Sequence, residues 1–293
     1  MTNRKVEMVA TPREPHFVGD GFRVHNYIPS YPRLDMARMD PFIMLDYNSK
    51  YHFPPSEIPK GVGVHPHRGF ETVTIAYKGK VEHHDSAGGG GIISEGDVQW
   101  MTAASGVLHK EFHEKEWSKT GGEFQMVQLW VNLAAKDKMS SPKYQAIEHA
   151  TINKVVLPND SGVVEVIAGE YQGVKGSAST FSPLHMYNVR LQKDGIATLN
   201  LPEDFNTVLL VIEGEITING TEIVKTDNLA LMANDGGEQF DVVASENAVV
   251  LVLSGQPLNE PIAAHGPFVM NTRHELSVAF SDFNSGKFGY LED

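Results

Sequence analysis

Short runs rich in β-branched and aromatic residues recur along the whole chain, separated by Gly, Pro, Asn and Asp. Examples are ETVTIAY (71–77), EFQMVQLWVNL (123–133), VVEVIAGEY (163–171), TVLLVIEGEITING (207–220) and AVVLVLSG (248–255). This spacing is typical of the many short strands of an all-β sandwich or barrel. Helical periodicity is clearest over TRHELSVAFSDF (272–283), where Thr272 and Glu275 fit a capping box. We therefore predict an all-β fold with a short C-terminal helix.

Two parts of the chain repeat one pattern of strand, turn glycine and strand. TVTIAYKGKV (72–81) resembles TVLLVIEGEI (207–216) at an offset of 135 residues (207 − 72 = 135). GDVQWMTA (96–103) resembles TDNLALMA (226–233) at an offset of 130 residues (226 − 96 = 130). Shared hairpin chemistry could also produce similarities this short, but duplication of a β domain is the preferred interpretation.

The length of the chain, 293 residues, is also that of about two domains. Charged and turn-forming residues replace the strand pattern in AAKDKMSSPKYQ (134–145). We therefore expect a first β domain over residues 1–140 and a second over 141–293, the second ending in the helix.

The composition disfavours several classes of protein. With 24 Lys+Arg against 37 Asp+Glu, the formal net charge is −13, which disfavours direct binding to nucleic acid or to anionic membrane surfaces. The apolar run AVVLVL (248–253) is far shorter than the roughly 20 residues that span a bilayer. The N-terminal segment lacks the apolar core of a secretory signal, so a soluble cytoplasmic protein is expected. Cysteine is absent, so any metal must be held by His, Asp or Glu.

The segment GVGVHPHRGFETV (61–73) contains two histidines, His65 and His67, that flank a single residue. Residues i and i+2 of a strand project from the same face, so these imidazoles would point the same way. An HxH pair alone is more often incidental than a ligand pair. However, His109 and Glu111 repeat the spacing after an intervening strand, turn and strand. Three imidazoles and one carboxylate brought together would suit a first-row divalent ion and leave coordination positions open.

Other polar residues near these pairs have simpler interpretations. His83 and His84 are adjacent, would point to opposite faces and precede the GGGG run, so we expect solvated turn residues and a hairpin connection. His113 and Glu114 are assigned to an exposed charged run, HEKE. Glu71 follows the first histidine pair in register, and is either a group next to the site or a carboxylate on its rim.

The internal repeat allows the metal-site positions to be compared with the second domain. At the two offsets, the counterparts of the four positions are Asn200, Pro202, Gln239 and Asp241. All three histidines are therefore lost together, which favours one metal site, in the first domain.

At these residues the sequence resembles the pirin family of the cupin superfamily. The resemblance rests on HPHRGFETVTIAYKGKVEHHDS (65–86), GDVQWMTAASGVLHKE (96–111), EFQMVQLWVNLAAKDKMSSPKYQ (123–145), DPFIMLDY (40–47) and HGPFVMNT (265–272). It implies a bicupin fold of two antiparallel β-barrel (jelly-roll) domains with a short C-terminal helix. It also implies a single metal in the N-terminal domain, with the family's ligands falling on His65, His67, His109 and Glu111.

The resemblance implies two kinds of function. Some pirins resemble quercetin 2,3-dioxygenases, which open a flavonol ring with O2. Others are iron-binding, redox-sensing proteins that regulate a transcription factor or a metabolic enzyme by protein–protein contact. We expect a flavonol dioxygenase with a small aromatic substrate, and keep regulation through a protein partner as the alternative.

Two residues are assigned roles in the dioxygenase hypothesis. Glu111 is the ligand able to accept a proton and is a candidate base, and Asp46 is a candidate residue of the substrate pocket. The expected cofactor is one divalent ion, iron(II), with Mn, Co, Ni, Cu or Zn as alternatives because His and Glu ligands accept several first-row metals.

Overall fold

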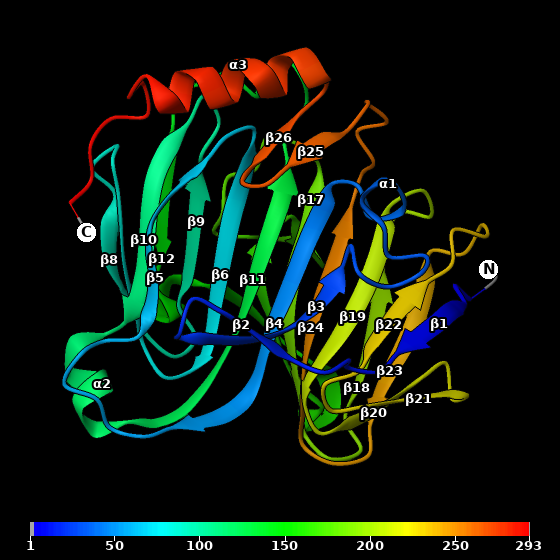
Figure 1. Ribbon diagram of the computed structural model, residues 1–293. Helices are drawn as coiled ribbons and strands as arrows, with labels where there is room; N and C mark the ends of the chain where they lie inside the picture. The colour runs from blue at the N-terminus through cyan, green and yellow to red at the C-terminus, as the bar shows by residue number, and fades with distance from the viewer. Residues whose placement is uncertain (1–2, 293) are drawn as a thin grey trace. The chain divides into compact units, whose positions relative to one another are not determined.

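The computed structural model describes residues 3–292, which form two compact units (Figure 1). Unit 1 comprises the described residues up to Pro12, then Arg38–Pro41 and Ala150–Pro257. Unit 2 comprises Arg13–Ala37, Phe42–His149 and the described residues from Leu258 on. The units differ from the contiguous division at residue 140, because each end of the chain is grouped with the opposite half.

Within residues 3–292, unit 1 contains two antiparallel sheets. The larger has the order β1 (Val6–Ala10), β22 (Leu229–Met232), β19 (Asn206–Glu213), β24 (Ala248–Gly255), β17 (Leu184–Leu191), β14 (Gly162–Ala168) and β13 (Asn153–Val156). The smaller has the order β18 (Ile196–Asn200), β23 (Gln239–Ala244), β20 (Glu215–Ile218) and β21 (Glu222–Lys225). Alternating apolar side chains of both sheets, such as Leu209 and Phe240, pack into one buried core.

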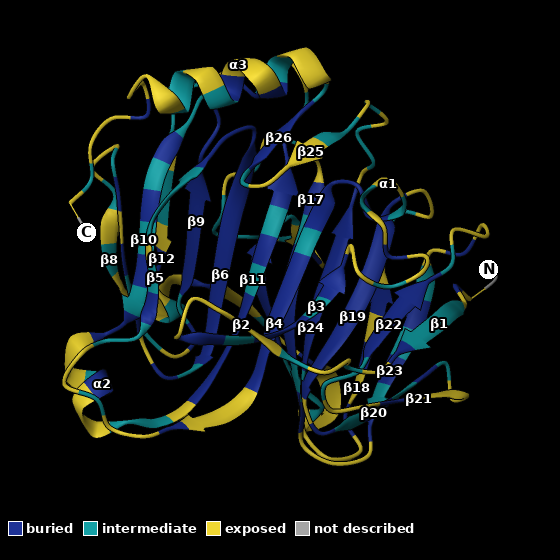
Figure 2. Ribbon diagram, viewed as in Figure 1, coloured by how far each residue is buried: buried dark blue, intermediate teal, exposed yellow. Residues whose placement is uncertain are grey.

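Unit 2, over its described residues, also contains a larger and a smaller antiparallel sheet. The larger has the order β12 (Lys143–Ile147), β9 (Val98–Thr102), β6 (Phe70–Lys78), β11 (Gly122–Asn132), β4 (Phe42–Phe53), β3 (Phe22–Ile28) and β2 (His16–Val18). The smaller has the order β5 (Gly61–His67), β10 (Val107–His113), β7 (Val81–Asp85) and β8 (Gly90–Ile93). In Figure 2 strand β6 of the larger sheet is almost entirely buried, and most of its neighbour β11 is buried as well.

The remaining elements are short. They are α1 (Met36–Met39), α2 (Lys115–Thr120), α3 (Arg273–Asn284), the hairpins β15 (Glu170–Tyr171) with β16 (Val174–Lys175) and β25 (Ala263–His265) with β26 (Phe268–Met270), and the 3-10 turns η1 (His149–Thr151) and η2 (Pro158–Asp160). Among the described residues, none of the helices is long and apolar enough to cross a membrane.

The predicted C-terminal helix is present as α3 and belongs to unit 2. Its capping box is formed, because the Thr272 hydroxyl accepts from the Glu275 amide while the Glu275 carboxylate accepts from the Thr272 amide. Leu276 and Ala279 pack against apolar residues of the β25–β26 hairpin. These contacts place the helix on the unit that carries the histidine pairs.

The two units share one strand topology, which supports the predicted duplication. The order β9-β6-β11-β4-β3 in unit 2 corresponds to β22-β19-β24-β17-β14 in unit 1. The register agrees as well: Val73 pairs with Leu129, and Val208, 135 residues after Val73 (208 − 73 = 135), pairs with Leu253. β1 takes in unit 1 the edge position that β12 takes in unit 2. The N-terminal strand therefore completes the sheet of the second repeat.

In the smaller sheet of unit 1, the residues that the repeat offsets match with the metal-site histidines do not point into the core. Asn200 pairs with Gln239, as His65 pairs with His109, but Asn200 is exposed and Gln239 half-buried. The inward-facing neighbours are Leu199 and Phe240, which are fully buried and apolar. Short similarities between strands do not resolve a displacement of one residue, and one residue reverses the face.

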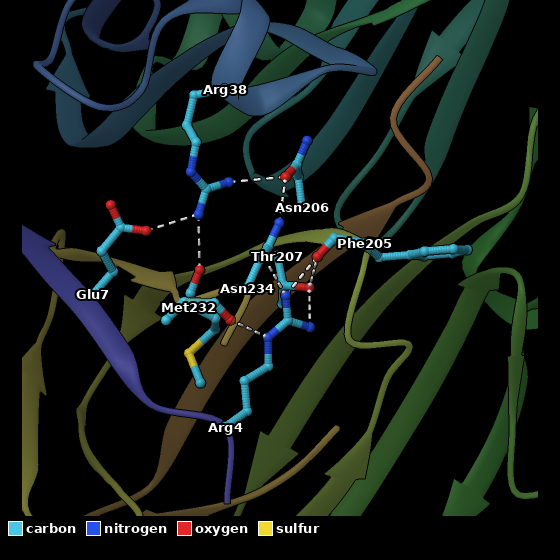
Figure 3. Close-up of polar contacts among 9 residues, drawn as sticks. Arg4, Glu7, Arg38, Phe205, Asn206, Thr207, Met232 and Asn234 are labelled. Carbon is cyan, nitrogen blue, oxygen red and sulfur yellow. Dashed lines mark hydrogen bonds and ion pairs between the residues drawn. The ribbon is translucent and has the colours of Figure 1, made fainter. Parts of the chain in front are cut away.

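A buried arginine of the N-terminal segment, Arg4, forms hydrogen bonds to the rest of unit 1 (Figure 3). The Arg4 side chain is fully buried, and burial lowers the pKa of its guanidinium to about 10. The guanidinium donates to the carbonyls of Phe205, Ala233 and Pro202, to the Thr207 hydroxyl and to the Asn234 side chain, at 2.5–3.1 Å. Within the described part of the chain, these bonds satisfy the buried cation without a directly bonded carboxylate.

Candidate metal centre

Strand pairing brings the two predicted histidine pairs together. β5 and β10 are antiparallel neighbours in the smaller sheet of unit 2, and His109 lies directly opposite His65. The ring centres of His65 and His67 are 4.7 Å apart, and that of His109 lies 5.2 Å from His65 and 5.8 Å from His67. Among the described residues, these three form the group whose ligand atoms all lie within 4.8 Å of one another and could hold a metal ion.

The hydrogen bonding of the three rings fits a divalent metal ion. His109 is fully buried, and neither of its ring nitrogens has a hydrogen-bond partner among the described residues. The same is true of Nδ1 of His67. In His65, Nδ1 lies 2.8 Å from the Gly63 carbonyl, so this nitrogen carries the proton and Nε2 keeps its lone pair. Buried polar atoms without partners are rare and costly, and a bound cation would satisfy them.

Burial also keeps these imidazoles in the form that binds metals. It lowers the pKa of His67 and His109 well below the ordinary value, and it lowers the pKa of His65 to a smaller extent. The neighbouring imidazoles act in the same direction on His67 and His109. The rings are therefore neutral at pH 7, as metal coordination requires.

Glu111 lies beside the histidines. It follows His109 by two residues on β10, and its Oε1 is 3.9 Å from Nε2 of His109. The Thr74 hydroxyl lies 3.4 Å from the same carboxylate oxygen. Burial raises the pKa of Glu111 to about 7, and the Thr74 hydrogen bond offsets part of this effect. The structure thus places the carboxylate beside His109, whereas the group of ligand atoms within 4.8 Å of one another contains the three histidines and not Glu111.

The site opens into a cavity of about 300 Å³ within unit 2. Most of its wall is apolar and is contributed by Val18, Phe22, Val24, Met44, Val62, Met126, Trp130, Gly266 and Pro267. Its polar lining consists of Asp46, Asn48, Gln128, Glu111, His65 and His67. The Trp130 ring stacks on Phe70 at 4.2 Å and meets His67 edge-on at 5.4 Å. An apolar cavity with a few polar groups is the usual form of a small-molecule site.

Asp46, the predicted pocket residue, lies in this lining. It accepts a hydrogen bond of 2.6 Å from Nδ2 of Asn26, and burial raises the pKa of its carboxyl group. In the ladder between β4 and β11 it lies opposite Gln128, whose Oε1 accepts from the Thr74 hydroxyl at 2.6 Å.

The lining residues that sequence reasoning missed include Asn48, Gln128 and Trp130. They come from strands β4 and β11, whose inward face carries Met44, Asp46 and Asn48 on one strand and Met126, Gln128 and Trp130 on the other. Strand alternation from Asp46 would have selected Asn48. Nothing in the local sequence shows that Met126 lies opposite it.

The prediction of a solvated His83 is wrong. β7 continues through both adjacent histidines, so His84 is exposed while His83 is fully buried. Nε2 of His83 lies 2.7 Å from the Tyr144 hydroxyl, and its ring centre is 5.9 Å from that of His109. Burial lowers the pKa of His83 to about 4.

The prediction of an exposed run at His113 and Glu114 is also wrong. His113 is buried among aromatic rings, and its Nε2 donates to the Gly21 carbonyl at 2.8 Å. Glu114 caps α2 by accepting from two backbone amides of its first turn.

Glu71 is buried too: it accepts from the Thr102 hydroxyl at 2.7 Å, and burial raises its pKa to about 7.

Comparison with known proteins agrees with this fold and site. Residues 21–131 match the family described as Pirin, and residues 186–289 match the Pirin C-terminal cupin domain. The chain belongs to the pirin family. The all-β bicupin fold predicted from the sequence is thereby confirmed.

Several relatives are similar over nearly the whole chain. A protein of Pseudomonas aeruginosa named "Putative quercetin 2,3-dioxygenase" is 48% identical over 93% of this chain and 94% of its own length. A pirin-like protein of Solanum lycopersicum is 37% identical over 93% of this chain and 89% of its own. The crystal structure of a quercetin 2,3-dioxygenase from Acinetobacter baumannii has 49% identity and a TM-score of 0.92, covering 99% of this chain and all of the other.

Proposed function

We propose that this pirin is a metal-dependent dioxygenase of the quercetin 2,3-dioxygenase type, which cleaves flavonols or similar enol-containing aromatics with O2. The observation that carries the proposal is a cluster of three histidines with buried ring nitrogens that have no hydrogen-bond partner among the described residues, beside an apolar cavity lined by His65 and His67. The names of two relatives of 48% and 49% identity support it.

In this proposal His65, His67 and His109 hold one divalent ion, with Glu111 as the fourth ligand. When bound, the ion would supply Lewis acidity and orient an oxygen group of the substrate. Iron(II) is the ion we propose, although imidazole and carboxylate ligands also accept Mn, Co, Ni, Cu and Zn.

The residues of the chain itself would bind the substrate and move a proton. Trp130, Phe22 and Met126 offer apolar and aromatic surface to flat rings. The Glu111 carboxylate would accept the proton of the enol hydroxyl, because it lines the cavity and lies 3.9 Å from the His109 ring. The apolar lining would exclude water from the reacting oxygen groups.

Incubation of iron-loaded protein with quercetin in air tests the proposal. We expect loss of the visible absorbance of quercetin, and loss of both metal and turnover in His67→Ala. His84→Ala is the matched control, because His84 is an exposed imidazole on the same sheet, and it should keep both. Turnover by metal-free His67→Ala would overturn the proposal. Quercetin left intact by iron-loaded wild-type protein would favour a regulatory role through a protein partner.

A further inference from the structure

Asn48 is a buried amide in the cavity wall with no hydrogen-bond partner within residues 3–292. It lies on β4, and only 2% of its surface is exposed. It lines the cavity, yet neither its Nδ2 nor its Oδ1 bonds to any described residue. Its partner across the ladder is Met126, and the next residue across is Ala76 on β6, so the other two members of its rung are apolar. Leaving such a group unpaired costs about 1–3 kcal/mol.

The fold itself does not require an amide at this position. The three-strand rung Ala76–Met126–Asn48 of unit 2 corresponds to the rung Val211–Val250–Val189 of unit 1. Val189 is fully buried in the apolar core of unit 1. A valine therefore fills the same place in the same sheet, and the amide of Asn48 is better explained by a ligand than by folding.

The position of Asn48 along β4 indicates which part of a ligand it would contact. Met44 lies opposite Trp130, whose ring is beside His67, and Asn48 follows Met44 by four residues. Four residues of a strand span about 13 Å. Asn48 is thus at the end of the cavity remote from His67, where an elongated aromatic ligand held at the histidines would place its far ring.

We propose that Asn48 is a specificity-determining residue that hydrogen bonds to a hydroxyl group on this remote ring. An amide can both donate to and accept from phenolic hydroxyls, so it suits a hydroxylated ring better than a bare one. The protein would therefore select flavonols that carry hydroxyls on the phenyl substituent. This inference rests on the proposed function, because it takes a flavonol as the ligand.

Binding of two flavonols tests the role of Asn48. Quercetin carries two hydroxyls on its phenyl ring, whereas galangin has the same fused rings and a bare phenyl ring. Binding to metal-loaded protein without O2 is measured, so that turnover plays no part. We expect wild-type protein to prefer quercetin by about tenfold or more, the factor that corresponds to about 1.4 kcal/mol. Asn48→Leu should lose this preference while binding galangin at least as tightly.

Two further variants distinguish the loss of a hydrogen bond at Asn48 from a change in the shape of the cavity. Asn48→Val, which copies Val189, should behave like Asn48→Leu, since neither can hydrogen bond. Met126→Leu, on the same rung, should change the affinities for both flavonols by the same factor and keep the preference. A preference that survives in both Asn48 variants, or an equal loss for both flavonols, would overturn the assignment.

The stability of the metal-free protein gives an independent readout. If the Asn48 amide forms hydrogen bonds only with a ligand, Asn48→Val should raise the melting temperature by about 2–4 °C, because it removes an unpaired buried group. A lower melting temperature in both variants would show that Asn48 serves the fold, and would overturn the inference. Failure of wild-type protein to bind either flavonol would instead overturn the proposed function. It would also exclude a flavonol hydroxyl as the hydrogen-bond partner of Asn48.

Discussion

His65 and His109 lie directly opposite each other in the antiparallel ladder between β5 and β10, with ring centres 5.2 Å apart. The positions of these rings are therefore set by backbone hydrogen bonds between two strands and not by a loop. A site carried by regular elements is held more rigidly than one carried by loops. The arrangement would thus be in place before a metal ion binds.

Removal of His109 should abolish the stabilisation of the protein by metal. A ligand that binds only the folded state adds about 2.7 kcal/mol at a concentration one hundred times its dissociation constant. We expect iron(II) or nickel(II) to raise the melting temperature of wild-type protein and of His84→Ala, and to leave that of His109→Ala unchanged. Thermal denaturation with and without metal measures this. A full metal-dependent shift in His109→Ala would exclude this imidazole as a ligand.

Trp130 should report metal binding by its fluorescence. Its indole lies 5.4 Å from the His67 ring, and the chain has three tryptophans in all. A paramagnetic ion such as nickel(II) bound at the histidines should quench mainly this residue. Titration of wild-type protein should lower the emission, and Trp130→Phe should lose most of that change while binding the same amount of metal. Equal quenching in the variant would place the ion elsewhere.

Most of the fold and three ligating candidates could be predicted from local patterns, because strand alternation and i, i+2 spacing are properties of short segments. The burial of His83 and His113 could not. Both lie in polar stretches, and the groups that cover His113 come from distant segments such as Phe53 and Phe124. The unpaired amide of Asn48 likewise becomes visible only when the ladder places Met126 opposite it.

His113 should make the stability of the protein depend on pH. Burial lowers its pKa to about 4, with a smaller contribution from Lys60, whereas the Gly21 carbonyl and Asp20 act in the opposite direction. Between pH 6.5 and 4 the unfolded chain binds a proton at this residue that the folded protein does not, so stability falls as the pH falls. We expect His113→Phe to lessen this fall by about 1.4 kcal/mol per pH unit.

Urea denaturation of metal-free protein at pH 7, 6 and 5 measures this difference. At pH 7 His113→Phe should lose only the hydrogen bond to the Gly21 carbonyl, about 1 kcal/mol. The two proteins should then become equally stable between pH 6 and pH 5, and His113→Phe should be the more stable at pH 5. Parallel curves would show that His113 titrates alike in the folded and unfolded states.

Loss of Arg4 should destabilise unit 1 more than loss of Arg38. Arg4 is fully buried and bonds three backbone carbonyls that would lose this donor, so Arg4→Met should cost on the order of 3 kcal/mol. Arg38 is partly exposed; it pairs with Glu7 at 2.9 Å and also donates to Asn206 Oδ1 and to one carbonyl, that of Met232, so Arg38→Met should cost on the order of 1–2 kcal/mol. Urea denaturation compares the two, and hydrogen exchange should show faster opening of β1 in Arg4→Met, since that strand follows Arg4 directly. Equal losses in the two variants would mean that the carbonyls around Arg4 find other donors.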